Sequence, residues 1–158
     1  MLDIRPLTNK DRSWVRQKTC QEWGTETVVA HGEIFHPDRL PGFCASRGKE
    51  TLGLITYQVC AAGCEIVTLN SWQEGLGIGT ALIEAVEQAA RGQGCRRLWL
   101  VTTNDNTTAL RFYQKRGFVL CALRVAVIQA SRQLKPQIPL LGVDGIPIRD
   151  ELELEMWL

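Results

Sequence analysis

The middle of the chain carries apolar residues at the spacing of an amphipathic helix. The residues on this stripe, at spacings of four, four and three, are Ile78, Leu82, Val86 and Ala89. Gly92 and Gly94 mark the end of the helix. The dense apolar run RRLWLVTT, residues 96–103, predicts a strand covered on both faces, and the run CEIVTL, residues 64–69, predicts a strand before the helix. Together these segments predict a βαβ unit with parallel strands and a right-handed crossover.

The flanking segments alternate between strands and helices. Strands are predicted at residues 2–7, at Val28 and Val29, in a hairpin over residues 42–59, at residues 118–128 and at residues 151–158. Helices are predicted from Asp11 to Trp23 and at residues 107–116, with Asp105 or Asn106 as the cap of the second. Residues 129–134 fit a helical turn, and residues 135–150 form a loop rich in proline and glycine. This order predicts an α/β fold: a mixed, mostly antiparallel central sheet with flanking helices and a central parallel βαβ unit.

Composition narrows the class of protein. The 158 residues fit one domain, 1–158, and 45% of them are hydrophobic, which is enough to fill a core. The 18 basic and 17 acidic residues give a formal net charge of +1, so no nucleic-acid partner is expected. No apolar run is long enough to span a bilayer and no signal peptide is visible, so we expect no membrane partner and a cytoplasmic location. A monomer and a homodimer both stay open.

The cysteines and histidines do not form a metal-binding pattern. The six cysteines are scattered without a CxxC pair, as expected of small buried thiols in a reducing compartment. The two histidines, His31 and His36, stand at no ligand spacing from a cysteine. No metal site is therefore expected.

Three alternate glycines, Gly75, Gly77 and Gly79, lie between the strand at 64–69 and the helix that follows. The first N–H groups of a helix lack partners within the helix and lie at the positive end of its dipole. Glycines let a phosphate approach those groups closely, so we interpret EGLGIGTA as a pyrophosphate cradle. A tight strand-to-helix turn with close packing is the structural alternative.

Two common phosphate-binding motifs do not fit this loop. A Walker A loop needs a lysine followed by Ser or Thr after its last glycine, but here Thr80 directly follows Gly79. A dinucleotide-binding turn needs G-x-G-x-x-G, and this loop is G-x-G-x-G. The hairpin upstream also argues against an open, parallel nucleotide-binding fold.

A second segment, NDNTTALRFYQKRGF at residues 104–118, completes the pattern. With the glycine loop it resembles the GNAT superfamily of acyl-CoA-dependent N-acyltransferases. The family's [Q/R]-x-x-G-x-[G/A] loop corresponds to EGLGIG, and its N-x-x-A-x-x-[L/F]-Y-x-x-x-G-F segment is matched at every position. The matching residues are Asn106, Ala109, Phe112, Tyr113, Gly117 and Phe118. The tail resembles a bacterial subgroup whose acceptor is unassigned.

The resemblance implies the GNAT fold, a cosubstrate and a reaction. Residues 65–70 and 98–103 would form parallel strands that separate and admit the pantetheine arm of acetyl-CoA. Backbone groups of Leu69 and Ser71 would pair with this arm, and an N–H near Leu69 or Asn70 would polarise the thioester carbonyl. The protein would then move an acetyl group from acetyl-CoA to a primary amine by direct attack in a ternary complex.

The resemblance also implies roles for particular side chains. Asn106 would hydrogen-bond the arm of the cosubstrate, and Tyr113 would protonate the departing thiolate. The residues implied to hold the pyrophosphate are Gly75, Leu76, Gly77, Ile78, Gly79 and Thr80. Glu74 begins this cofactor-binding loop where the family usually has Gln or Arg, so its carboxylate should point away from the phosphates or lower the affinity.

The attacking amine must be neutral, so a base or a water relay is needed. The resemblance implies a catalytic role for Glu65, on the strand before the loop, where many GNAT enzymes place a carboxylate; a solvated strand residue is the alternative. His31 and His36 lie in the irregular segment 26–42, which borders the acceptor site by analogy. Either histidine has the right chemistry for a base near neutral pH, and an exposed loop histidine is the alternative.

The late part of the chain supplies the other expected border of the acceptor site. Residues 30–40 and residues 135–150 are expected to form its two walls. A row of glutamates, Glu151, Glu153 and Glu155, would either attract a cationic acceptor or form a solvated strand face. Two other functions stay open: a non-catalytic acyl-CoA-binding or regulatory module on the same fold, and a different phosphate-ligand protein such as a nucleotide binder.

Overall fold

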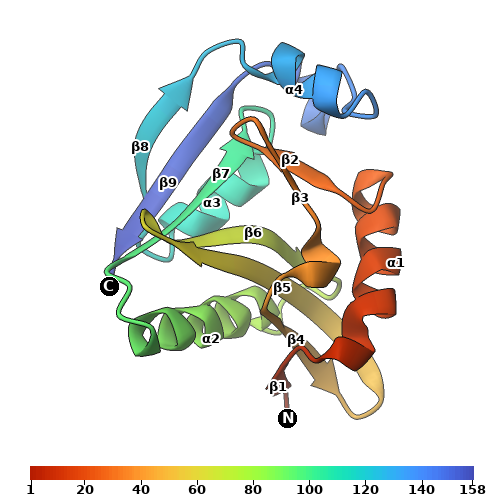
Figure 1. Ribbon diagram of the computed structural model, residues 1–158, viewed down its shortest axis with the longest axis vertical. Coiled ribbons are helices and arrows are strands. Elements are labelled where there is room, and N and C mark those ends of the chain that lie inside the picture. Colours follow the sequence, from red (N-terminus) through yellow and green to blue (C-terminus); the bar gives the residue numbers. More distant parts are fainter.

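The computed structural model describes residues 1–158 and contains nine strands and four α-helices (Figure 1). The strands are β1 (Asp3–Pro6), β2 (Val28–Ala30), β3 (Glu33–Phe35), β4 (Gly42–Arg47), β5 (Glu50–Cys60), β6 (Gly63–Ser71), β7 (Arg97–Thr103), β8 (Val119–Arg124) and β9 (Glu151–Trp157). The helices are α1 (Arg12–Trp23), α2 (Ile78–Gly92), α3 (Thr107–Gln114) and α4 (Ile128–Leu134). None of these helices has the length and apolar character needed to cross a membrane.

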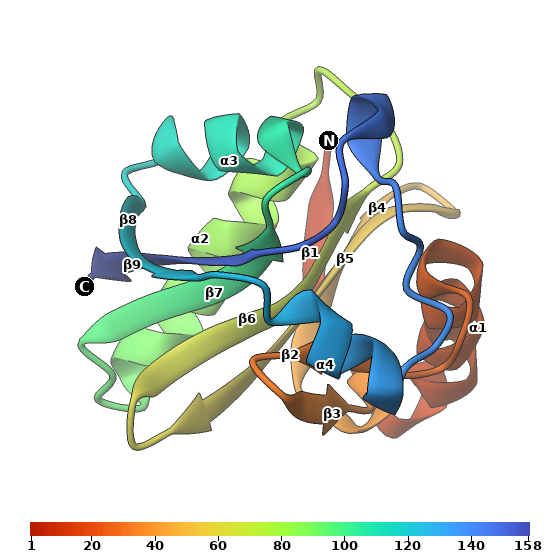
Figure 2. The ribbon, with the colours of Figure 1, turned by 90° about the horizontal axis from the view of Figure 1, so that it is seen from above.

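Seven strands form one sheet in the order β1-β4-β5-β6-β7-β9-β8, while β2 and β3 form a separate hairpin. Only β6 and β7 are parallel neighbours; the other strand pairs are antiparallel. The predicted mixed, mostly antiparallel sheet with a central parallel βαβ unit is therefore confirmed. α2 and α3 cover one face of the sheet, and α1, α4 and the β2–β3 hairpin lie on the other (Figure 2).

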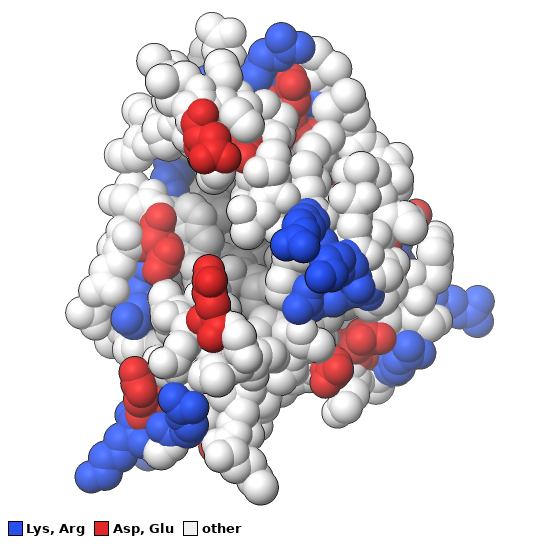
Figure 3. Space-filling view, turned by 180° about the vertical axis from the view of Figure 1, so that it is seen from behind, with Lys and Arg blue, Asp and Glu red and all other residues white.

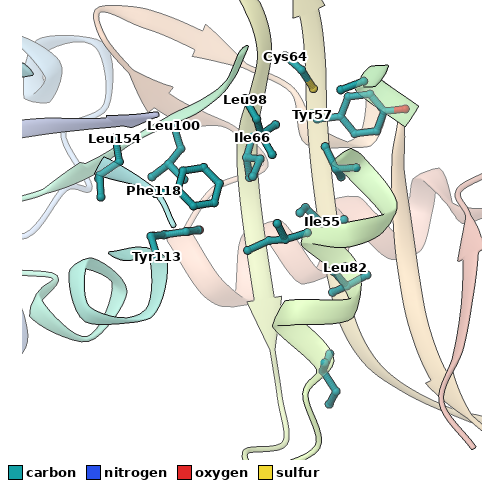
Figure 4. Close-up of a cluster of buried hydrophobic side chains, with 14 of the residues drawn as sticks. Ile55, Tyr57, Cys64, Ile66, Leu82, Leu98, Leu100, Tyr113, Phe118 and Leu154 are labelled. Carbon is teal, nitrogen blue, oxygen red and sulfur yellow. The ribbon is translucent and has the colours of Figure 1, made fainter. Parts of the chain in front are cut away.

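The face under α2 holds the hydrophobic core (Figure 4). Ile78, Leu82 and Val86 of α2 are fully buried there, as their spacing predicts, and Ala90 completes the buried stripe where Ala89 is only partly covered. The residues of the strands, of α3 and of the α3–β8 connection in the same core cluster are Ile55, Tyr57, Cys64, Ile66, Leu98, Leu100, Tyr113, Phe118 and Leu154. Burial of this apolar surface is the main stabilising contribution to the fold.

The opposite face of the sheet is polar even where it is buried. Glu65 is 1% exposed, and the hydroxyls of Thr56 and Thr68 share a 2.6 Å hydrogen bond between β5 and β6. Buried polar groups are tolerated only where partners satisfy them, so this face depends on specific pairing rather than on apolar packing. The two faces of one sheet therefore have different chemistry.

Two elements differ from the prediction. The strand expected at 118–128 ends at Arg124, because Ala126 has a φ of 60° that breaks the extended chain, and helix α4 begins at Ile128. The expected strand at Val28 and Val29 is one arm of a hairpin whose second arm, β3, was not predicted. His31 and Gly32, both at positive φ, form its two-residue turn.

A matched pair of leucine truncations tests where the core lies. Leu82→Ala removes a fully buried side chain and should lower the free energy of unfolding by roughly 2–5 kcal/mol. Leu123→Ala on β8, where the residue is 58% exposed, should change it by no more than about 0.5 kcal/mol. Urea unfolding followed by circular dichroism measures both. Equal losses for the two variants would contradict this assignment of the core.

Candidate active site

The turn between β6 and α2 leaves open space above two of its three glycines. Gly75 and Gly77 have φ values of 77° and 69°, and a Cβ placed on either would meet no atom within 4 Å. Gly79 differs, because a Cβ there would lie 2.7 Å from the ring of Phe112. The first two glycines thus keep the turn open, whereas Gly79 lets α2 pack closely against α3.

The N-terminus of α2 faces this opening without a side-chain cap. The first backbone hydrogen bond of α2 runs from the N–H of Ala81 to the carbonyl of Gly77, at 3.0 Å, so the N–H groups of Ile78, Gly79 and Thr80 precede it. Such free N–H groups at the positive end of a helix form a ready anion site. Glu74 is exposed at the start of the loop and makes no hydrogen bond or ion pair.

A positive charge just beyond the C-terminus of α3 also reaches this helix end. The guanidinium of Arg116 donates a 2.8 Å hydrogen bond to the hydroxyl of Thr80 and stacks 3.5 Å from the centre of the Phe112 ring. Figure 3 shows a hollow on this side of the molecule, with basic side chains gathered on one edge and acidic side chains on the others. Arg116 was not predicted as a site residue, because only the packing of α3 on α2 brings it to Thr80.

β6 and β7 pair over only two residue pairs, Cys64 with Leu98 and Glu65 with Trp99. Both strands continue well beyond this point, and they diverge in Figure 1, so a gap opens between them. Just after β6, the backbone N–H of Trp72 donates to the carbonyl of Leu52 on β5. Because successive N–H groups of a strand point to opposite edges, those of Leu69 and Ser71 point into the gap, whereas that of Asn70 points toward β5.

Asn106 and Tyr113 both lie on α3. Asn106 is the N-cap: its Oδ1 accepts the N–H of Ala109 at 3.3 Å, and its Nδ2 donates to the hydroxyl of Thr102 at 3.2 Å. Of the two predicted caps, Asn106 is therefore correct. Tyr113 is 8% exposed and packs edge-on against Phe112 and Phe118. Burial raises the pKa of its hydroxyl, so Tyr113 keeps its proton at neutral pH.

Glu65 lies on the polar face of the sheet, directly at the start of the gap. One carboxylate oxygen is 2.6 Å from Nε2 of His31, and the other is 3.4 Å from the side-chain amide of Gln58. The hydrogen bond to Glu65 raises the pKa of His31, and the carboxylates of Glu65, Glu33 and Glu151 raise it further against the opposing effect of burial. The alternative in which Glu65 is a solvated strand residue is wrong.

His31 joins this site from the β2–β3 turn, and His36 does not. The backbone N–H of His31 donates to Glu151 at 2.9 Å, and its ring lies 5.4 Å from that of Trp99 and 5.6 Å from that of Phe35. His36 instead precedes the 3-10 helix Pro37–Arg39. No group of three or more His, Cys, Asp or Glu side chains that could hold a metal is present.

The glutamates of β9 form a buried ionic network rather than a solvated face. Glu151 and Glu153 are only 3% and 9% exposed. Arg124 of β8 reaches both, at 3.2 and 2.6 Å, and Arg97 of β7 pairs with Glu153 at 2.7 Å and with Glu155 at 2.5 Å. The expected solvated row is therefore wrong: the β2–β3 turn and α4 lie against Glu151, and arginines pair with the carboxylates of Glu151, Glu153 and Glu155.

A pocket of about 470 Å³ lies next to His31. One wall is the β2–β3 turn, as expected from residues 30–40. The rest is Arg124, Glu151 and α4, contributed through Val127, Ala130, Ser131, Gln133 and Leu134. The loop 135–150, expected as the second wall, is instead held beyond α4 by Arg132, which donates to the carbonyls of Ile138, Pro139 and Ile148.

Two buried polar atoms on the strands that flank the gap have no partner. Oδ1 of Asn70 on β6 and Nε1 of Trp99 on β7 are both inaccessible and make no hydrogen bond. Unpaired buried groups are costly, so they mark a place where a bound molecule can supply the missing bond.

Comparisons with known proteins identify the family of this chain. The family model for the acetyltransferase (GNAT) family matches residues 6–118. The uncharacterized protein YdhI of Bacillus subtilis is 44% identical over 153 residues, which is 96% of this chain and 96% of that protein. Streptothricin acetyltransferase of Streptomyces lavendulae is 39% identical over 84 residues, 44% of each chain.

The solved structures show the same fold. A Bacillus subtilis acetyltransferase in complex with CoA superimposes with a TM-score of 0.72 at 20% identity, covering 100% of this chain and 99% of that one. The family match spans most of the chain and includes the glycine turn, the gap between β6 and β7, and α3. The protein belongs to the acetyltransferase (GNAT) family.

Proposed function

We propose that this protein moves the acetyl group of acetyl-CoA to a primary amine by direct attack in a ternary complex, with residues 1–158 acting as one acetyltransferase domain in the cytoplasm. The observation that carries the proposal is the junction of the open glycine turn with the gap between β6 and β7. Phosphates and an extended arm need these two features side by side, and the chain order β6–turn–α2 supplies them together.

The residues present fit acetyl-CoA. Above Gly75 and Gly77 there is room for a pyrophosphate against the free N–H groups of Ile78, Gly79 and Thr80. The cation of Arg116 beside Thr80 offsets the carboxylate of Glu74, which is exposed and free to turn away. The unpaired strand edge at Leu69 and Ser71 accepts the extended arm as a strand would be accepted, by backbone hydrogen bonds.

When bound, acetyl-CoA supplies the acetyl group as a thioester. The N–H of Leu69, which points into the gap, polarises the carbonyl and stabilises the charge that develops on its oxygen. Tyr113, protonated and buried beside the gap, donates a proton to the departing sulfur. Glu65 is one of the residues that serve to remove the proton from the incoming ammonium. Asn106 holds the start of α3 in place beside the arm and contributes its amide to the same edge.

The relatives support the same reaction class. The solved Bacillus subtilis structure is that of an acetyltransferase with CoA, and the Streptomyces lavendulae relative is a streptothricin acetyltransferase. We propose an amine acceptor of the same general kind for this chain, without naming the compound. Release of free thiol from acetyl-CoA in the presence of a panel of primary amines is the direct test.

A non-catalytic acyl-CoA-binding module is the second candidate. The observation that favours it is Glu74, whose negative charge stands where the family usually has Gln or Arg. Such a module would bind CoA but release no thiol with any amine of the panel. The intact Tyr113 and the buried carboxylate of Glu65 favour the enzyme.

A pair of glycine substitutions tests the phosphate cradle. Gly77→Val places a branched side chain at the N-terminus of α2 and should abolish CoA binding measured by isothermal titration calorimetry. Gly94→Val, beyond the other end of α2, is the control, because Gly94 has a similar φ of 78° and equally open surroundings. Both variants should lose similar stability from the strained backbone. Unchanged CoA binding by Gly77→Val would overturn the cradle.

The hydroxyl of Tyr113 should matter for turnover and not for binding. Tyr113→Phe keeps the ring packing on Phe112 and Phe118, so CoA affinity should change little while turnover falls by roughly 10²–10⁴-fold. Tyr57→Phe, which removes the other buried tyrosine hydroxyl of the chain, should leave turnover unchanged. If Tyr113→Phe turns over an accepted amine at the wild-type rate, Tyr113 has only a packing role.

A further inference from the structure

We infer that His31 is the general base that takes the proton from the acceptor's ammonium, and that Glu65 acts on the reaction only by positioning His31. This inference rests on the proposed function and assigns the base within it. It gives Glu65 a positioning role and makes the β2–β3 turn part of the active site.

Glu65 itself has no route to an acceptor. Its side chain is 1% exposed, and both carboxylate oxygens face protein donors, Nε2 of His31 at 2.6 Å and the amide of Gln58 at 3.4 Å. A direct base must meet the ammonium within hydrogen-bond distance, or through one water. The side chain of His31 is 18% exposed and borders the 470 Å³ pocket, so it is the member of the pair that an acceptor meets.

The position of His31 is enforced against its backbone preference. Its φ of 41° lies in the left-handed region, and with Gly32 it forms a two-residue turn of the kind that favours Asn-Gly. Three contacts hold the imidazole there: the hydrogen bond to Glu65, the backbone N–H bond to Glu151, and the ring of Trp99. Departures from local preference that the surroundings fix in this way gather at functional sites.

The imidazole lies where the gap in the sheet begins. Glu65 and Trp99 are the last parallel pair of β6 and β7, and His31 contacts both side chains from the pocket side. The amine in the pocket and the thioester in the gap would therefore meet beside the free edge of the ring. α4 lines this pocket with uncharged side chains only, so Glu151 and Arg124, already paired with each other, are the other charged groups there.

The hydrogen bond to Glu65 also determines which ring nitrogen of His31 can accept a proton. With Nε2–H donated to the carboxylate, Nδ1 of the neutral ring has a free electron pair. Nδ1 takes one proton from R–NH3⁺, and the resulting amine forms the C–N bond as the C–S bond breaks. The second N–H proton replaces the one that Tyr113 gives to the sulfur, and His31 later releases its own proton to water. One amide, one thiol and one free proton result, so the step balances.

Only the neutral imidazole of His31 can accept a proton, and its fraction falls as the pH drops below the pKa of His31. Glu65 raises this pKa. Wild-type kcat/KM should decrease as the pH drops through this raised pKa. The groups that raise the pKa are Glu65 on β6, Glu33 on β3 and Glu151 on β9, and burial of the ring opposes them. Arg124 on β8 is the neighbouring cation and is paired with Glu151. Glu65→Gln keeps the shape of the side chain and removes its charge, so it should move the acid limb of the profile to lower pH.

The decisive variant is His31→Asn, since asparagine suits the positive φ of the turn and should keep the hairpin folded. It should lower kcat/KM at pH 7 by roughly 10²–10⁴-fold, remove the acid limb, and leave CoA affinity unchanged. His36→Asn, the change of the only other histidine, is the matched control and should behave as wild type. A wild-type rate and pH profile for His31→Asn on an accepted amine would overturn the inference while the proposed function stands.

A second measurement does not depend on activity. NMR titration of the two histidine rings should give His31 a pKa above the usual 6.5, and Glu65→Gln should lower it. If Glu65→Gln leaves the titration of His31 unchanged, the pair is not formed in solution and the inference falls. If wild-type protein binds CoA but acetylates no amine of the panel, the proposed function fails and the inference falls with it.

Discussion

The early end of the pairing between β6 and β7 is the constraint on which the site depends. Two parallel strands that are both buried normally continue side by side, because each unpaired N–H or carbonyl inside a protein is costly. Here the ladder stops after Glu65 and Trp99, and the edge of β6 that faces β7 is left unpaired as far as Ser71.

A β-bulge accompanies this divergence. Val67 is an extra residue in β6, since Thr56 pairs with Thr68 and Tyr57 with Ile66. Such a bulge increases the local twist and bends the strand.

The ionic network on the polar face is the counterpart of the apolar core. Arg97 and Arg124 link β7, β8 and β9 through ion pairs with Glu151, Glu153 and Glu155. Glu151 also connects this network to the β2–β3 hairpin, because it accepts the backbone N–H of His31. A buried pair of charges adds little net stability compared with apolar packing, but loss of one partner leaves an uncompensated charge and costs about 3–5 kcal/mol. The network therefore fixes position more than it adds stability, which suits a surface that must hold a turn at positive φ over the sheet.

Local patterns predicted what depends on near neighbours in the sequence. The stripe of α2, the cap at Asn106 and the open turn at Gly77 follow from spacing of three or four residues and from the chemistry of helix ends, and the structure has all three.

The alternation in ELELEMWL predicted a strand with one polar face, but alternation does not say whether that face meets water. The burial of Glu151 depends on α4 and on the hairpin. A helical turn was predicted at residues 129–134, where α4 lies, but β3 has no pattern long enough to be predicted. The contact between His31 and Glu65 joins residues 34 positions apart, so no local sequence pattern predicts it.

The two faces of the sheet divide the proposed reaction between them. The glycine turn, α3 and Arg116 lie on the face of α2, whereas His31, the pocket and α4 lie on the opposite face (Figure 2). A thioester and an amine that approach from opposite faces meet only where the sheet is open, and the sheet is open only beyond the last pair of β6 and β7.

The same two residues, Glu65 and Trp99, thus end the strand pairing and hold the imidazole of His31. In this arrangement the architecture itself limits transfer to an acceptor that fits the pocket beside His31, because an amine elsewhere on the surface has no line of approach to the carbonyl.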